Sequence, residues 1–190
     1  MKIFDCFMFY DEELLLDIRL NILDKYVDFF VIVESQFYHN GVKRQLKFDI
    51  KKFNKFKDKI IYIQHKNEPD QIFKFNEKDN EGIKSSKLIH NAHLRENDQR
   101  NHILKGLKKA KNDDLILISD VDEIPNFNSI NLSKIKNQII MFEQEIFYYK
   151  FNRYLTNFKW FGTKACRKKD LQSPQWLRNI KNKKYPFWRI

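Results

Sequence analysis

The stretch Leu115–Pro125, LILISDVDEIP, decides the fold class of this chain. It opens with an apolar run, Leu115–Ser119, and continues into Asp120, Asp122 and Glu123. A near-continuous apolar run is typical of a parallel strand that helices cover on both faces. The stretch therefore predicts a central strand of a parallel sheet, with two carboxylates directly after its carboxyl end.

The segments on either side of this strand alternate between strand and helix. Runs rich in aromatic and β-branched residues predict further strands at 2–7, 28–34, 59–63, 139–142 and 147–151. Apolar residues at helical spacing predict one helix that Asp11 caps and that extends to about Tyr26, and a second over 96–111. The polar stretch from about 65 to 91 is interpreted as a long loop or loosely structured insertion. The pattern indicates an α/β fold with a mostly parallel central sheet flanked by helices.

Length and composition bound the class of protein. The 190 residues suit one domain, 1–190, and an apolar fraction of 42% with 15% aromatic residues excludes a disordered chain. No apolar run approaches the roughly 20 residues of a membrane span, and the N-terminus lacks the features of a secretory signal. Cys6 and Cys166 match no metal or redox spacing and are predicted to be free thiols. These features together predict a cytoplasmic protein.

The net charge of +11 is compatible with an anionic partner such as nucleic acid, a membrane surface or a phosphorylated substrate. Lys outnumbers Arg 28 to 8, however, and Arg makes the commonest specific contacts with bases. We therefore expect no specific nucleic-acid partner, whereas peripheral contact with an anionic surface stays open.

The two aspartates after the apolar run are the strongest candidates for a functional site. Asp120 and Asp122 stand two residues apart, so on an extended segment their side chains point the same way. Ligands of open α/β sheets bind at the carboxyl ends of the strands, and paired carboxylates suit Mn²⁺ or Mg²⁺ bound together with a phosphate-bearing ligand. Glu123 either supports this pair or points to solvent. The alternative is a polar turn with exposed acids.

Competing metal and nucleotide motifs fit the chain poorly. The four glycines supply no Gly-Lys-Ser/Thr, which a phosphate-binding P-loop needs, and the residues after Asp120 lack the offsets of a calcium-binding EF-hand. His90 and His93 form an H-x-x-H pair in the predicted loop, but a zinc site would need further ligands.

With these residues in view, the chain resembles glycosyltransferase family 17, the family of the β-1,4-mannosyl-glycoprotein β-1,4-N-acetylglucosaminyltransferase. The resemblance rests on five segments that occur in the family's order and cover nearly the whole chain. They are IFDCFMFYDEELLLDIRLNIL, VDFFVIVESQFYHNG, ENDQRNHILKGL, DDLILISDVDEIP and FYYKFNRYLTNFKWFGTKACRKKDL.

The resemblance implies a GT-A-like nucleotide-sugar-binding fold and a metal-dependent, inverting transfer from a UDP-sugar to a glycan acceptor, with N-acetylglucosamine as the expected sugar. Asp120 and Asp122 would bind the metal, Mn²⁺ or Mg²⁺, and Asp120 would also hold the donor. Glu34 would lie near the nucleoside pocket, with a structural strand-end carboxylate as the alternative. Arg100 and Asn101 would face the donor, with a solvated helix face as the alternative.

The chain also departs from the family. Family members continue past the end of this sequence into a Gly-Trp-His segment and further helices on the acceptor side, so we expect a C-terminally truncated form. The catalytic base is not identified by the sequence, although Glu143 and Glu145 could each serve. Two alternatives remain: a basic nucleic-acid-binding or metal-dependent phosphoryl-transfer protein, and a transferase remnant without catalytic activity.

Overall fold

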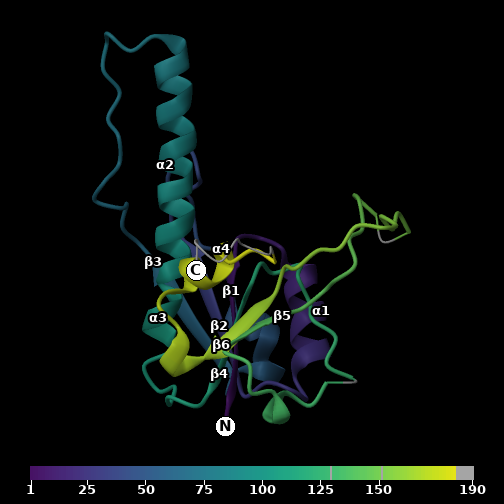
Figure 1. Cartoon of the computed structure of the whole chain (residues 1–190). Coiled ribbons are helices and arrows are strands. Elements are labelled where there is room, and N and C mark those ends of the chain that lie inside the picture. The colour runs from purple at the N-terminus through teal and green to yellow at the C-terminus, as the bar shows by residue number, and fades with distance from the viewer. Residues whose placement is uncertain (129, 151, 183–190) are drawn as a thin grey trace.

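The computed structural model describes residues 1–128, 130–150 and 152–182. Six strands of these residues form one sheet in the order β3-β2-β1-β4-β6-β5 (Figure 1). Neighbouring strands from β3 to β4 are parallel, and β6 runs antiparallel to both β4 and β5. The mostly parallel sheet predicted from the sequence is confirmed. The strands are β1 (Ile3–Phe9), β2 (Phe29–Ser35), β3 (Ile60–His65), β4 (Leu115–Ser119), β5 (Ile139–Met141) and β6 (Lys164–Arg167).

Helices cover both faces of this sheet (Figure 1). One face packs against α1 (Glu13–Leu23) and the 3-10 helix η1 (Ile50–Phe56). The other packs against α3 (Ile103–Gly106) and α4 (Pro174–Asn179). Alternate residues of each parallel strand enter the two cores, which is why β4 is buried along its whole length. Two further 3-10 turns are η2 (Leu132–Lys134) and η3 (Lys168–Asp170).

The order of the strands creates a crevice at the carboxyl ends of the two central strands, β1 and β4. From β1 the chain proceeds outward to β2 and β3, and then returns to place β4 on the other side of β1. In open α/β sheets a ligand binds outside the carboxyl ends of the strands at such a reversal. Phe7 pairs with Ser119 in the ladder between β1 and β4, so the residues that follow both strands meet at this point.

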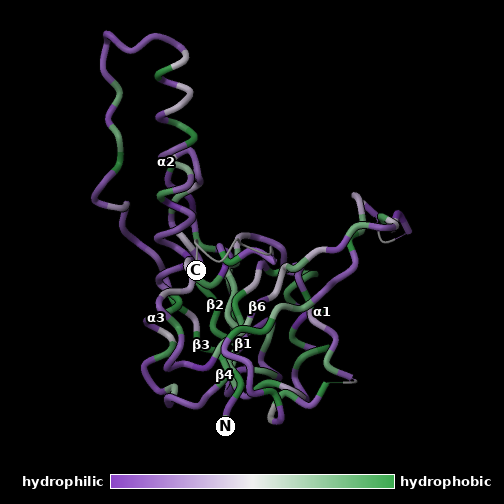
Figure 2. The backbone as a smooth tube through the Cα atoms, viewed as in Figure 1, coloured by the Kyte–Doolittle hydropathy of each residue, from purple (hydrophilic) through white to green (hydrophobic). Residues whose placement is uncertain are grey.

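The long helix α2 (Glu81–Asn101) and the loop before it differ most from the sequence prediction. They project from the sheet as an arm, residues 66–94, whose loop is largely hydrophilic (Figures 1 and 2). The predicted loop over 65–91 is therefore wrong beyond Asn80, where α2 begins. The Asn80 side chain caps the helix by accepting a hydrogen bond from the Ile83 N–H, 2.9 Å away. The predicted helix over 96–111 is divided at His102 and ends earlier.

Other element boundaries are also corrected. Helix α1 starts at Glu13 without a side-chain cap, so the predicted cap at Asp11 is wrong, and it ends at Leu23. The predicted strand over 147–151 is absent from the described residues 147–150, where Phe147 makes an isolated bridge, and residue 151 lies outside the description. Strand β6 was not predicted.

Cys6 and Cys166 are free thiols, as predicted. Both are buried, and burial raises the pKa of both thiols. No helix among the described residues is long and apolar enough to cross a membrane.

Candidate active site

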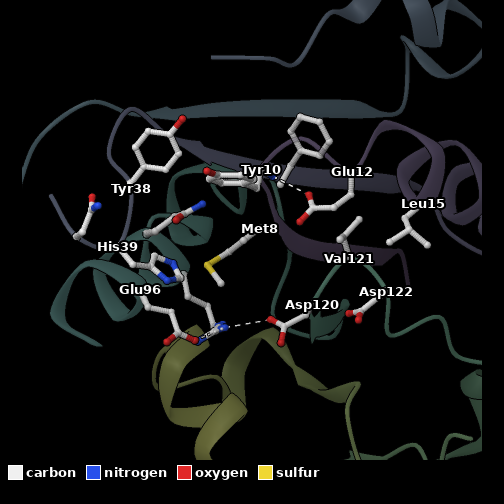
Figure 3. A pocket seen from close by; sticks show the side chains of 14 residues that line it. Met8, Tyr10, Glu12, Leu15, Tyr38, His39, Glu96, Asp120, Val121 and Asp122 are labelled. Atoms are coloured by element: carbon white, nitrogen blue, oxygen red, sulfur yellow. Dashed lines mark hydrogen bonds and ion pairs between the residues drawn. The ribbon is translucent and has the colours of Figure 1, made fainter. Parts of the chain in front are cut away.

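A cavity of about 740 Å³ lies at the crevice between the ends of β1 and β4 (Figure 3). The ends of these strands, the loop after β2 and the last turns of α2 supply its walls. Its lining residues are Met8, Phe9, Tyr10, Glu12, Leu15, Tyr38, His39, Asn40, Glu96, Gln99, Arg100, Asp120, Val121 and Asp122. The cavity thus contains both aspartates that the sequence singled out, while Val121 between them is buried.

A fully buried arginine holds the loop that carries these aspartates. Arg19, on α1, donates two hydrogen bonds to the Asp5 carboxylate, of 2.8 and 2.6 Å. Its Nη1 donates to the backbone carbonyls of Asp120 and Val121, both at 3.1 Å, and to that of Glu123 at 3.0 Å. The guanidinium group therefore fixes the backbone of the loop by hydrogen bonds, and the Asp5 carboxylate balances its positive charge.

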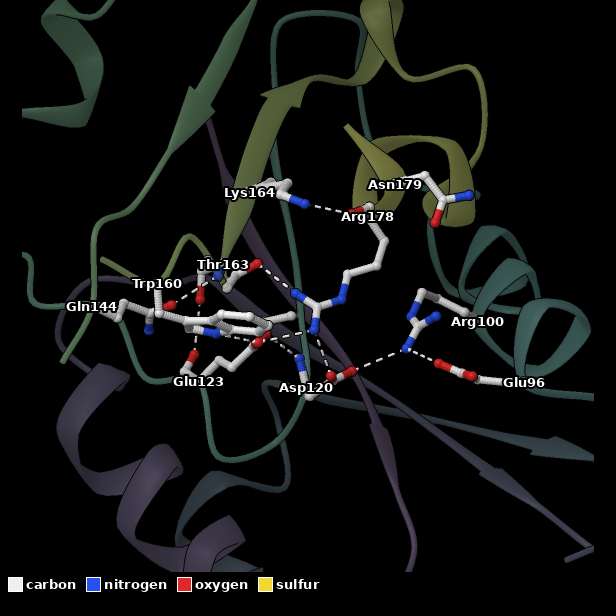
Figure 4. Close-up of polar contacts among 12 residues, drawn as sticks. Glu96, Arg100, Asp120, Glu123, Gln144, Trp160, Thr163, Lys164, Arg178 and Asn179 are labelled. Atoms are coloured by element: carbon white, nitrogen blue, oxygen red, sulfur yellow. Dashed lines mark hydrogen bonds and ion pairs between the residues drawn. The ribbon is translucent and has the colours of Figure 1, made fainter. Parts of the chain in front are cut away.

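The Asp120 carboxylate lies between two arginines (Figure 4). Arg100 Nη2 donates to its Oδ1 at 3.0 Å, and Arg178 Nη2 donates to its Oδ2 at 2.7 Å. Burial alone would lower the pKa of Arg178, but Asp120 and Glu123 outweigh it and raise that pKa. The Asp122 side chain is exposed and lines the same cavity. Asp122 is therefore the carboxylate most accessible to a cation.

Glu123 is buried and supports the loop instead of pointing to solvent. Its Oε2 accepts a hydrogen bond from the Asp120 N–H at 2.8 Å. Its Oε1 accepts from Arg178 Nη2 and from Trp160 Nε1, both at 2.9 Å (Figure 4). A Cβ added at Gly162 would lie 2.5 Å from this carboxylate, so only glycine lets the segment of Trp160 approach so closely.

Arg100 and Asn101, expected on the donor side, have different positions. Arg100 lines the cavity with 2% of its side chain exposed and also pairs with Glu96 at 3.0 Å. Its Nε is the one buried side-chain nitrogen or oxygen of the described residues without a hydrogen-bond partner. Asn101 instead accepts a hydrogen bond from the Gln175 N–H at 3.0 Å, which joins α2 to α4.

Glu34 is fully buried at the end of β2 and does not belong to the cavity lining. Its carboxylate accepts hydrogen bonds from the N–H groups of Lys47 and Phe48, at 2.6 and 3.1 Å, and from Tyr62 Oη at 2.7 Å. It also pairs with Arg44 at 3.1 Å. Glu34 therefore holds Arg44 and residues 47–48 in place behind the cavity and does not line it.

Arg44 in turn supports an aromatic side of the cavity. Its guanidinium lies 4.2 Å from the centre of the Tyr10 ring and 5.9 Å from that of Tyr38. Tyr10 and Tyr38 lie 5.6 Å apart and stand on one side of the cavity, and Asp120 and Asp122 stand on another (Figure 3). One cavity thus combines an aromatic side with an acidic side.

Several residues of this site were missed by the sequence reasoning. Arg19, Arg44 and Arg178 each act through partners that are distant in sequence, and no local motif marks them. The only available signal was the scarcity of arginine in a lysine-rich chain, which makes each arginine worth inspecting.

The candidate bases and the histidine pair lie elsewhere. Glu143 and Glu145 are exposed and outside the cavity lining, and Glu143 pairs with Lys159 at 3.0 Å. The His90 ring packs on Phe73, and His93 is exposed.

Fold and site together define an α/β protein with a cavity at the carboxyl ends of its parallel strands. The model of glycosyltransferase family 17 matches residues 1–175, which is most of the chain. The chain therefore belongs to glycosyltransferase family 17 and is a transferase of that family. No curated protein and no solved structure matches it.

Proposed function

We propose that this chain is a metal-dependent, inverting glycosyltransferase with a GT-A-like fold, which transfers N-acetylglucosamine from UDP-N-acetylglucosamine to a glycan acceptor. The observation that carries the proposal is the cavity at the crevice between β1 and β4, with Asp120 and Asp122 in its wall, in a chain of a glycosyltransferase family. A cavity of about 740 Å³ is large enough for a nucleotide-sugar, since ligand pockets commonly measure about 300–1,000 Å³.

The acidic side of the cavity would receive the diphosphate and its cation. Asp122 would bind the metal directly, because its carboxylate is exposed and not occupied by an arginine of the described residues. Asp120 is held by Arg100 and Arg178, which are themselves suited to phosphate oxygens. Mn²⁺ or Mg²⁺ bound here would offset the negative charge on the departing UDP.

The aromatic side of the cavity would receive the nucleoside. Tyr10 and Tyr38 supply ring surface for a planar base, and Asn40 supplies a polar edge. Glu34 would contribute indirectly, because it fixes Arg44, which packs on Tyr10. Its role would then be to position the aromatic side of the cavity.

The transfer itself needs a base near the acceptor. In an inverting transfer the acceptor oxygen forms a bond to the sugar's anomeric carbon, the bond to phosphate breaks, and UDP leaves with the electron pair. The proton of the acceptor hydroxyl passes to a base. Two further carboxylates line the cavity, Glu12 and Glu96, and they are the candidates to examine in place of Glu143 and Glu145.

Calorimetric titration of UDP-N-acetylglucosamine into the protein, with and without Mn²⁺, tests the proposal. We expect binding that needs Mn²⁺ and weakens by at least about tenfold in Asp122→Asn, which removes a proposed metal ligand. Asp113→Asn is the matched control, because Asp113 is exposed and pairs with Lys169 far from the cavity lining. Absence of binding by the folded wild type to UDP-N-acetylglucosamine, UDP-glucose and UDP-galactose would contradict the proposal.

A further inference from the structure

A second group of metal-ligating side chains lies at the base of the arm. His65 ends β3, directly before the arm, and Asp98 and His102 stand directly after it at the end of α2. One ligand atom of each residue lies within 4.8 Å of the others. The ring centres of His65 and His102 are 4.3 Å apart, and His65 Nε2 lies 2.7 Å from Asp98 Oδ2. None of the three residues lines the cavity described above.

The imidazoles of this group are already oriented by their other nitrogens. His65 Nδ1 lies 3.1 Å from Ser35 Oγ, which itself accepts a hydrogen bond from the Phe37 N–H. His102 Nδ1 lies 3.0 Å from the backbone carbonyl of Asp98, so the proton stays on Nδ1 and Nε2 is the basic nitrogen. Metal-binding histidines are typically held in this way by a hydrogen bond from the nitrogen that does not bind the ion.

The surroundings also allow an ion to enter. The side chain of His65 is only 1% exposed, whereas that of Asp98 is 37% exposed. Solvent therefore reaches the group from the side of Asp98, and rotation of this side chain would open the space between the ligands.

The two imidazoles and one carboxylate point to a different ion from that of the acidic cavity. A set of two nitrogens and one oxygen, completed by water, is typical of tetrahedral Zn²⁺, with ligand distances of about 2.0–2.2 Å. Mg²⁺ and Mn²⁺ prefer oxygen ligands.

We propose that His65, Asp98 and His102 bind Zn²⁺, and that this ion fastens the base of the arm. It would join the point where the chain leaves the sheet to the point where α2 returns to it, next to an ion pair of 2.8 Å between Arg95 and Glu68. The turns of α2 that it fixes carry Glu96, Gln99 and Arg100 into the cavity. The site is structural and independent of the reaction proposed above.

Titration of the chelator-treated, tag-free chain with Co²⁺, followed by displacement with Zn²⁺, tests this proposal. We expect the visible absorption of tetrahedral Co²⁺, binding of one ion per chain, displacement by Zn²⁺ but not by Mn²⁺, and a higher unfolding temperature with Zn²⁺. His102→Ala and Asp98→Asn should each weaken Zn²⁺ binding by at least about tenfold and abolish the rise in unfolding temperature.

His93→Ala is the matched control, because His93 lies on the same helix and is exposed. It should bind Zn²⁺ as the wild type does. The proposal is overturned if the wild type binds no Zn²⁺ at submillimolar concentration, if His102→Ala and Asp98→Asn bind as tightly as the wild type, or if His93→Ala alone loses binding.

Discussion

At the scale of single residues, arginines carry the organisation of the site. Arg19 fixes the backbone of the loop that follows β4, and Arg44 supports the aromatic side of the cavity. Arg178 holds Asp120 and Glu123. Each uses several donors at once, which the single ammonium of a lysine cannot reproduce. In a chain with 28 lysines and 8 arginines, this use of arginine is a matter of geometry more than of net charge.

Replacement of Arg19 should therefore be costly. In Arg19→Met the buried Asp5 carboxylate loses its counter-charge and three loop carbonyls lose a donor, so we expect a loss of about 3–5 kcal/mol in the free energy of unfolding. Chemical denaturation measures it. Lys52→Met, which breaks the exposed pair with Glu13, should cost less than about 1 kcal/mol. Equal losses in the two variants would contradict this account.

Lys164 makes stability depend on pH. Burial, followed by Arg178 and Lys181, lowers its pKa from 10.5 to about 8. Between these values the unfolded chain binds the proton and the folded chain does not, so this lysine's contribution to stability rises with pH across the window. The penalty for burying the charged amine is complete below about pH 8 and fades towards the unfolded pKa.

We therefore expect the unfolding free energy of the wild type to increase relative to that of Lys164→Met as the pH is raised from about 8 to about 10. Denaturant titrations of both proteins across this range supply the difference. Lys159→Met removes an exposed lysine and should show no such trend relative to the wild type. A difference that is flat or falls with pH would show that Lys164 stays protonated.

At the scale of elements, the apolar strands were predictable and the polar helix was not. Strand β4 has the predicted bounds because all five of its residues are buried and apolar or small. Helix α2 buries Asn91, Arg95, Gln99 and Arg100, so no apolar stripe marks it in the sequence. Its contacts with the body depend on side-chain hydrogen bonds to distant segments, which periodicity does not report.

The candidate site was likewise predictable only in part. Asp120 and Asp122, which the sequence placed together, both line one cavity, although they lie on a turn and not on an extended segment. For Glu34 and Asn101 the local pattern could not tell whether the polar group turns towards the cavity or towards a neighbouring segment. The structure turns Glu34 towards residues 44–48 and Asn101 towards α4.

The packing of α3 on the sheet leads to a prediction for Gly106. A Cβ at this position would lie 2.4 Å from Val31 Cγ1, so Gly106→Ala forces α3 away from β2 and should cost about 1–3 kcal/mol. Gly82→Ala, in the first turn of α2, meets only Asn80 Oδ1 at 3.4 Å and should be neutral or stabilising. Thermal unfolding measures the stability of both variants. A higher unfolding temperature for Gly106→Ala than for Gly82→Ala would contradict the close packing of α3 on β2.

At the scale of the whole molecule, the strand order places the cavity at the carboxyl ends of β1 and β4, where we propose that the chemistry takes place. The reversal of strand order between β1 and β2 on one side and β4 on the other opens the crevice, and α1 and α2 contribute the residues that fix its walls. The arm, residues 66–94, projects away from this place (Figure 1).

The central claim is that Asp122 and the cavity between β1 and β4 hold the metal and diphosphate of a nucleotide-sugar. A crystal structure of the chain with UDP-N-acetylglucosamine and Mn²⁺ tests it most directly. We predict one Mn²⁺ bound by an Asp122 oxygen and by diphosphate oxygens, with the uracil beside Tyr10 and Tyr38. A nucleotide bound outside this cavity, or an ion in it that Asp122 does not contact, would contradict the claim.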